Sequence, residues 1–341
     1  MKNLYIVVNE KIYGNKKFFF CENKDIKSIV DFLSNKYNTF IITRSSNQKK
    51  PFKLKKNNKI LNLNLKNFFS FFFFLFNVKK KKKKLLIISI TPFNFIIFLV
   101  FKLLYQSKFY LYLRSNGYEE YKSILGKKYI WIYDFMFKYM TKFSEVITCH
   151  KRLYKKKCHI LRPSELSISW NKNIIKNNFN KNSINILYVG RFKIEKGIYS
   201  LLKLFPHLPK NIKLTLVGSG DLLQIQDDRI KVVNFIKDEK KLIKIYDDND
   251  IIILPSYTEG HPKVIDESLS RLRPVIIFNE IKYVIDERIG VFCSKRSSKN
   301  LEDKINFIKN NYNKIIDGIK KNKLPTKNLF LNNLNKIIAN N

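Results

Sequence analysis

Short apolar runs alternate along this chain with longer segments in which apolar residues recur at helical spacing. Apolar runs of about four to eight residues followed by amphipathic segments are typical of βαβ units, so the pattern predicts an α/β fold with doubly wound sheets. Ten strands are expected, in two groups. They are Leu4–Val8, Thr39–Thr43, Leu85–Ile90, Phe109–Leu113 and Glu145–Thr148, then Ile184–Val189, Lys213–Val217, Ile230–Val233, Ile251–Leu254 and Val275–Phe278.

The two groups of strands are separated by a stretch rich in Asn and Lys. A chain of 341 residues, 45% of them hydrophobic, is long and apolar enough for two domains of ordinary size. The tail from Asn300 is expected to be helical. The expected boundaries are a first domain over 1–166, a linker over 167–183, a second domain over 184–323 and a C-terminal helix over 324–341.

A largely apolar segment, Leu85–Phe101, approaches the length of a membrane span. Its first six residues have the pattern of a strand, Thr91 can cap a helix, and Pro92 suits the first helical position. A buried strand and helix are therefore favoured over a span. No signal peptide is expected, because Leu4–Val8 is too short for its apolar core. These features together favour a cytoplasmic location.

Positive charge is concentrated in the first half of the chain. The whole chain has a formal net charge of +39, and residues 1–163 hold 35 Lys and Arg against 8 Asp and Glu. Such an excess attracts polyanions, so nucleic acid and an anionic membrane are both candidate partners. The aromatic run Phe68–Phe76, followed by Lys79–Lys84, favours peripheral binding to the inner face of the cytoplasmic membrane. A buried helix followed by a solvated loop is the alternative.

Two patterns suggest a metal, and neither is favoured. Cys149 and Cys158 are each followed by His, but they lie nine residues apart, wider than the spacing of a zinc knuckle. Asp247, Asp248 and Asp250 form a DxD-like group, but they precede a buried strand, where a polar helix end is expected. We expect no metal and no cofactor.

Cationic side chains follow the first strand of the second group. Gly190 and Arg191 come directly after Ile184–Val189, and Lys196 lies five residues further on. Arg191 offers a fork of donors and Lys196 a point charge, and both can reach one diphosphate. Six of the ten glycines fall in loops of this half, including Gly218 after the next strand. That clustering favours a close approach of the backbone to a ligand.

Two carboxylates follow the strand Ile251–Leu254. A helix is expected to begin at Pro262, so Glu259 lies in the loop before it and Glu267 about one turn inside it. The first backbone N–H groups of that helix, at Lys263 and Val264, can hold a phosphate. Carboxylates accept hydrogen bonds from sugar hydroxyls. An anion site flanked by such acceptors suits a sugar nucleotide.

These segments resemble the nucleotide-binding half of the family-4 (group 1) nucleotide-sugar glycosyltransferases. The family's pattern is Gly-Arg, Glu-Lys-Gly, a strand with a Gly-x-Gly turn, Pro-Ser, Glu-Gly, and a second Glu eight positions after the first. All occur in order between Gly190 and Glu267. The resemblance implies a GT-B fold, with two facing Rossmann-like doubly wound domains, a cleft between them, and a final helix that crosses back to the first domain.

The resemblance also implies a function. The implied reaction moves a sugar from a nucleotide-diphosphate sugar to a hydroxyl of a saccharide or lipid-linked acceptor. The enzyme would be a retaining, metal-independent glycosyltransferase. Its product would serve cell-surface polysaccharide or lipopolysaccharide synthesis. Arg191 and Lys196 would hold the diphosphate, and with Glu259, the sugar contact, they form the expected catalytic set. Glu267 would contact the ribose. The expected donor-binding residues are Gly190, Arg191, Lys196, Gly218, Glu259, Gly260, His261, Lys263, Val264 and Glu267.

The acceptor side is marked by YLRSNGYEEY from Tyr112, which is similar to an Arg-Ser-Asp-Gly-Tyr segment of polysaccharide-forming members. It indicates Arg114, Asn116 and Glu119 as acceptor residues. One departure from the family is Arg273, which stands at the usual glycine position. Two other functions stay open: a catalytically inactive partner subunit and, on charge alone, a basic nucleic-acid-binding protein.

Overall fold

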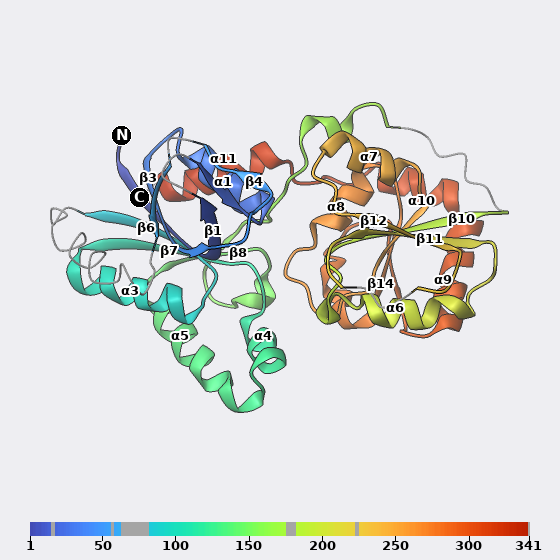
Figure 1. Cartoon of the computed structure of the whole chain (residues 1–341), viewed down its shortest axis with the longest axis horizontal. Helices are drawn as coiled ribbons and strands as arrows, with labels where there is room; N and C mark the ends of the chain where they lie inside the picture. Colours follow the sequence, from blue (N-terminus) through green and yellow to red (C-terminus); the bar gives the residue numbers. More distant parts are fainter. Residues whose placement is uncertain (15–17, 56–57, 63–81, 175–181, 222–224, 340–341) are drawn as a thin grey trace. The chain divides into compact units, whose positions relative to one another are not determined.

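The computed structural model describes the chain except for residues 15–17, 56–57, 63–81, 175–181, 222–224 and 340–341. Contacts divide it into two compact units, each with its own sheet (Figure 1). The first unit is Met1–Glu165 together with Lys327–Asn341, and the second unit is Leu166–Thr326. The final helix α11, Lys327–Ala339, therefore belongs to the first unit.

The sheet of the first unit is mainly parallel. Strand β1 pairs in parallel with β3 and β6, and β6, β7, β8 and β9 follow one another in parallel; the short β2 and β4 are antiparallel additions. The strands are β1 (Asn3–Gly14), β2 (Phe19–Cys21), β3 (Asn38–Ser46), β4 (Phe52–Lys53), β5 (Lys59–Asn62), β6 (Lys83–Ile88), β7 (Ser107–Leu113), β8 (Glu145–Thr148) and β9 (His159–Ile160).

Helices cover both faces of this sheet (Figure 1). One face packs against α1 and α11 around a core that includes Ile29 and Leu334, and the other against α3 and α5 around Phe98 and Met136. Two faces buried by helices are what a parallel sheet requires. The helices are α1 (Lys24–Leu33), α3 (Pro92–Leu104), α4 (Gly117–Ile124) and α5 (Ile130–Lys142), with the 3-10 turns η2 (Lys127–Tyr129) and η3 (Lys151–Leu153).

The apolar segment Leu85–Phe101 forms a strand and a helix, as predicted. Pro92 begins α3, and the Thr91 side chain accepts a hydrogen bond from the Asn94 N–H. In the part of the chain that the structure describes, every helix is too short or too polar to cross a membrane. The four cysteines are free thiols.

Strand β6 begins at Lys83, two residues before the predicted start. The Lys83 side chain is buried, with its ammonium 5.6 Å from the ring centroid of Tyr105, and Lys84 donates to the Ile338 carbonyl at the end of α11. The expectation that the whole run Lys79–Lys84 precedes the strand was therefore wrong for these two lysines, because long cationic side chains can bury their stems against rings and carbonyls. Phe68–Phe76 and Lys79–Lys81 lie outside the described residues.

The second unit contains a fully parallel six-stranded sheet in the order β12-β11-β10-β13-β14-β15. In chain order these are strands 3-2-1-4-5-6, the order of a Rossmann fold. The order reverses between β10 and β13, so the carboxyl ends of these two strands mark the expected ligand position. The strands are β10 (Ile184–Val189), β11 (Ile212–Gly218), β12 (Ile230–Asn234), β13 (Ile251–Leu254), β14 (Val275–Phe278) and β15 (Val291–Ser294).

Helices also cover both faces of the second sheet (Figure 1). The segment expected as a linker begins with the 3-10 turn η4 (Ile168–Asn171), whose Trp170 is buried in the core of this unit. The other elements are α6 (Ile198–Leu204), α7 (Glu239–Asp247), α8 (Lys263–Ser270), α9 (Ser298–Asn310) and α10 (Tyr312–Ile319), with η5 (Ile194–Lys196), η6 (Phe205–His207) and η7 (Asn279–Val284).

Candidate functional site

The loops after β10 and β13 meet at the point where the strand order reverses. Lys196 ends the turn η5 in the first loop, and its Nζ lies 2.7 Å from Oε1 of Glu259 in the second. The Ser256 hydroxyl donates to the same oxygen at 2.7 Å. The Lys196 and Glu259 side chains are 23% and 10% exposed. A cation and a carboxylate from the two predicted motifs are thus joined at the carboxyl ends of adjacent strands.

Further contacts fix the backbone of Glu259. Its N–H donates to the Tyr283 hydroxyl at 3.0 Å, and that hydroxyl donates to the Glu259 carbonyl at 2.6 Å. Arg296 donates to the Pro255 carbonyl at 2.9 Å, and its guanidinium lies 4.1 Å from the ring centroid of Tyr257. Neither Tyr283 nor Arg296 was singled out from the sequence, because each stands outside the motif pattern and reaches the loop only through the fold.

Two of the glycines are required by contacts within the site itself. Gly197 has a positive φ of 67°, and a Cβ there would lie 1.9 Å from the Pro255 carbonyl oxygen. A Cβ on Gly218 would lie 1.9 Å from the Gly190 carbonyl oxygen. The sequence favoured close approach to a ligand as the reason for these glycines. In the structure the close neighbour is the backbone of an adjacent loop, which brings the strand ends together.

Arg191 is exposed in the loop after β10. Its backbone carbonyl accepts a hydrogen bond from the Tyr188 hydroxyl at 2.8 Å, so the residue is held by its main chain. Among the described residues, the Arg191 guanidinium has no hydrogen-bond or ion-pair partner. Such a side chain is available to an incoming anion.

Helix α8 carries the second carboxylate. Pro262 is the N-cap, so the helix begins one residue later than predicted, at Lys263, followed by Val264. The N–H groups of a first helical turn lack partners within the helix, and the helix dipole favours negative charge there. Glu267 lies further along α8, and its Oε2 accepts a hydrogen bond from the Tyr246 hydroxyl at 2.8 Å. Burial, and then the nearby carboxylate, raises the pKa of Tyr246, which keeps this hydroxyl protonated.

His261 stands just before the expected start of the helix, where the sequence indicates a donor contact or, as the alternative, the helix cap. In the structure it is held in a buried polar cluster. Its Nε2 lies 2.8 Å from Oδ2 of Asp266, and Arg288 places a guanidinium nitrogen 3.2 Å from Nδ1. Burial raises the pKa of Asp266, but hydrogen bonds and charge from His261 and Arg288 outweigh it and hold that pKa below its ordinary value. The helix cap is Pro262, so the capping role was wrong.

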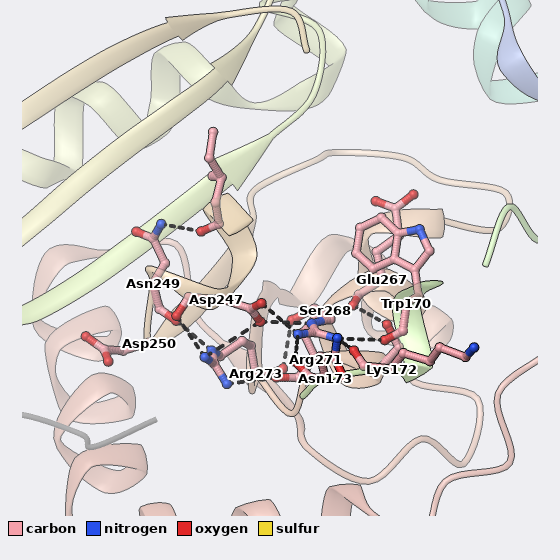
Figure 2. A network of polar contacts seen from close by, with 12 residues as sticks. Trp170, Lys172, Asn173, Asp247, Asn249, Asp250, Glu267, Ser268, Arg271 and Arg273 are labelled. Carbon is pink, nitrogen blue, oxygen red and sulfur yellow. Dashed lines mark hydrogen bonds and ion pairs between the residues drawn. The ribbon is translucent and has the colours of Figure 1, made fainter. Parts of the chain in front are cut away.

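A second polar cluster lies at the other end of α8 (Figure 2). The buried Arg271 makes a bidentate ion pair with Asp247, at 2.8 and 2.6 Å. Arg273 donates to the carbonyls of Asp247 and Asn249, both at 2.8 Å. The left-handed backbone in this turn falls at Leu272, with φ 57°, and not at Arg273, which was expected at the glycine position.

The Asp247, Asp248 and Asp250 group does not converge on a metal. Asp247 pairs with Arg271, and Asp250 accepts from the Asn185 N–H at 2.7 Å. Within the described ranges, no cluster of three or more His, Cys, Asp or Glu is placed to hold a metal ion.

The expected acceptor residues lie in the first unit, after β7. Arg114 makes an ion pair with Asp25 in the first turn of α1. Asn116 is the N-cap of α4, and its side chain accepts from the Tyr118 N–H. Glu119 follows in the first turn of α4, with a half-exposed side chain. The structure gives Arg114 and Asn116 local partners, and their acceptor role stays a prediction.

The comparisons with known proteins agree with this geometry. Residues 171–323 match the family model described as glycosyl transferases group 1. The match covers 153 of the 341 residues and falls within the second unit, which is therefore similar to the group 1 glycosyltransferases. An uncharacterized glycosyltransferase of Methanocaldococcus jannaschii is 26% identical over 206 residues, which are 52% of this chain and 49% of that protein. The chain therefore spans about half the length of that relative.

Two further comparisons bear on the function and on the fold. The GalNAc-alpha-(1->4)-GalNAc-alpha-(1->3)-diNAcBac-PP-undecaprenol alpha-1,4-N-acetyl-D-galactosaminyltransferase of Campylobacter jejuni is 28% identical over 130 residues, 35% of this chain and 34% of that enzyme. The solved structure of Anabaena HepE in complex with UDP matches with a TM-score of 0.67 at 12% identity, over 100% of both chains. The structural match confirms the GT-B fold, with two Rossmann-like domains.

Proposed function

We propose that this chain transfers a sugar from a nucleoside diphosphate sugar to a hydroxyl of a saccharide or lipid-linked acceptor, in the synthesis of a cell-surface polysaccharide or lipopolysaccharide. The proposal rests on one observation above all. Lys196 and Glu259, from the two separate motifs, meet at the reversal point of a Rossmann sheet. That is where open α/β sheets bind ligands.

The charges around this point suit a diphosphate leaving group. Arg191 and Lys196 lie in the loop after β10, and the N-terminal turn of α8 follows the loop after β13. Departure of a nucleoside diphosphate develops negative charge, which fixed cations and helix N–H groups stabilise. These groups can do the electrostatic work that a metal ion does in other transferases, so we propose that the reaction is metal-independent.

Glu259 is assigned to the donor sugar and Glu267 to the ribose. Both carboxylates can accept hydrogen bonds from hydroxyls. Glu259 lies in the loop before α8, and Glu267 lies within the helix. The Anabaena neighbour was solved with UDP, which supports a nucleotide in this fold. We also propose that the anomeric configuration is retained, with the acceptor attacking the face that the diphosphate leaves.

A lipid-linked acceptor would bring the enzyme to a membrane surface. The C. jejuni relative is named for an acceptor linked to undecaprenol through a diphosphate. In the first unit, Trp131 and Phe135 are 68% and 57% exposed on α5, four residues apart, and Lys138 and Lys142 continue the same helical face. Exposed aromatics beside lysines suit the headgroup layer of an anionic membrane. We propose that this face of α5 docks on the inner face of the cytoplasmic membrane.

A nucleotide-sugar panel tests the proposed function. The full chain is incubated with UDP-, GDP- and ADP-linked sugars and with a polyprenyl-diphosphate saccharide, and products are identified by mass spectrometry in the presence of EDTA. One nucleotide sugar should be consumed with release of its nucleoside diphosphate and addition of a sugar to the acceptor. Binding of nucleotide without any turnover would favour the inactive partner subunit.

A further inference from the structure

Tyr246 lies between the nucleotide-binding helix and the segment with which the second unit begins. It lies in the last turn of α7, next to Asp247, and its side chain is completely buried. Its hydroxyl donates to Glu267 at 2.8 Å, while its ring makes an edge-on contact with Trp170, with 5.3 Å between the centroids. The Tyr246 side chain therefore contacts both Glu267, the predicted ribose contact, and Trp170 of η4.

Arg271 holds the backbone of the segment that carries Trp170 (Figure 2). Arg271 donates to the Trp170 carbonyl at 3.0 Å, to the Lys172 carbonyl at 2.8 Å and to the Asn173 carbonyl at 2.9 Å. Its two remaining donors bind Asp247, the neighbour of Tyr246. All five donors of this buried guanidinium are used, so the segment 170–173 and the end of α7 are held as one body.

A carboxylate on a helix surface can adopt several rotamers, and a ligand must select one of them. A hydrogen bond from a buried, rigidly held phenol restricts that choice before the ligand arrives, which lowers the entropic cost of binding. Tyr246 has no freedom of its own, because Trp170 packs against its ring. The cluster is thus built to orient Glu267 rather than to touch a ligand directly.

We propose that Tyr246 is a positioning residue for nucleotide binding, and that its hydroxyl orients the Glu267 carboxylate toward the ribose. Trp170 and Arg271 hold the Tyr246 ring in place, and so connect the first residues of the second unit with the donor site. This inference rests on the proposed function, in that it takes Glu267 as a nucleotide contact.

The test is a double-mutant cycle on nucleotide affinity, measured by calorimetry with UDP, and with GDP and ADP in parallel. Tyr246→Phe keeps the ring contact and removes only the hydroxyl. It should weaken binding about tenfold, the scale of a hydrogen bond to a charged group. In the Glu267→Gln background the same change should alter affinity less than about twofold, because the two residues act as one unit.

Tyr312→Phe is the matched control. It removes another buried hydroxyl of the second unit, one that donates to the Asp250 carbonyl at 3.4 Å, and it should leave nucleotide affinity unchanged.

The outcomes separate this inference from the proposed function. If Glu267→Gln weakens binding but Tyr246→Phe binds like the wild type, or if the two effects multiply, Tyr246 is not a positioning residue. If the wild type binds none of the three nucleotides, the proposed function fails and this inference fails with it.

Discussion

Lys196 Nζ and Glu259 Oε1 lie 2.7 Å apart, although 63 residues separate them in the sequence. The pair joins the loop after β10 to the loop after β13, and both side chains are largely shielded from water. In the proposed reaction the two groups serve different parts of the donor, the diphosphate and the sugar. The ion pair therefore balances their charges while no donor is bound, and it must loosen when a diphosphate competes for Lys196.

Glu259→Gln should separate nucleotide binding from turnover. The change removes the carboxylate that competes for Lys196, so affinity for the free nucleoside diphosphate should rise by about two- to fivefold. Sugar transfer should fall, because the donor sugar loses a charged acceptor. Calorimetry and product release measure the two effects on the same preparation. Wild-type turnover in this variant would contradict the assignment of Glu259 to the donor sugar.

Glu267→Gln should have the opposite effect on binding. The ribose contact is lost from the ground state, so affinity for the free nucleotide should fall about tenfold. Glu302→Gln on α9 is a matched control and should bind like the wild type. Equal affinities in Glu267→Gln and the control would contradict the ribose assignment.

Arg271→Met should destabilise the second unit strongly. It leaves the buried Asp247 carboxylate without its main partner, together with three backbone carbonyls of residues 170–173. Removing one member of a buried ion pair costs about 3–5 kcal/mol in the free energy of unfolding.

The control for this prediction is Lys320→Met, which removes an exposed partner of Asp317. It should cost less than about 1 kcal/mol. Urea unfolding followed by circular dichroism compares the two variants. A cost for Arg271→Met as small as that of the control would show that the cluster adds little to stability.

The membrane proposal predicts that binding to vesicles depends on the aromatic face of α5. Replacing Trp131 and Phe135 with Ser should sharply reduce sedimentation with vesicles that contain anionic lipid, and salt should weaken binding of the wild type. Phe235→Ser removes a similarly exposed aromatic from the second unit, 50% exposed, and should bind like the wild type. The proposal would be contradicted if the wild type did not bind anionic vesicles at low salt but bound single-stranded nucleic acid tightly.

The parallel strands were the most predictable part of the fold. Glu145–Thr148, Ile184–Val189, Ile251–Leu254 and Val275–Phe278 have the bounds expected from their apolar pattern. Strand β1 runs past the predicted Val8 to Gly14, because its polar end forms a hairpin with β2, in which Tyr13 pairs with Phe20. The end of β1 is a strand only because it pairs with a partner, so its sequence contains no apolar run that would predict it.

The candidate site was predictable where a motif carried it and not where buried polar side chains complete it. Lys196 and Glu259 stand in recognisable patterns, so their meeting was foreseeable. Tyr246 instead has the pattern of an ordinary helix residue, and no motif in the sequence marks Arg271. Long-range hydrogen bonds give both residues their roles. Sequence spacing says nothing about such partners.

The central claim is that the second unit binds a nucleoside diphosphate at the meeting point of the loops after β10 and β13. Calorimetry of UDP, GDP and ADP binding to the full chain in EDTA tests it most directly. We predict one site for one of these nucleotides, and a loss of about 1.5–3 kcal/mol in binding free energy for Arg191→Ala and for Lys196→Ala. Binding of none of the three nucleotides, or unchanged affinity in both variants, would contradict the account.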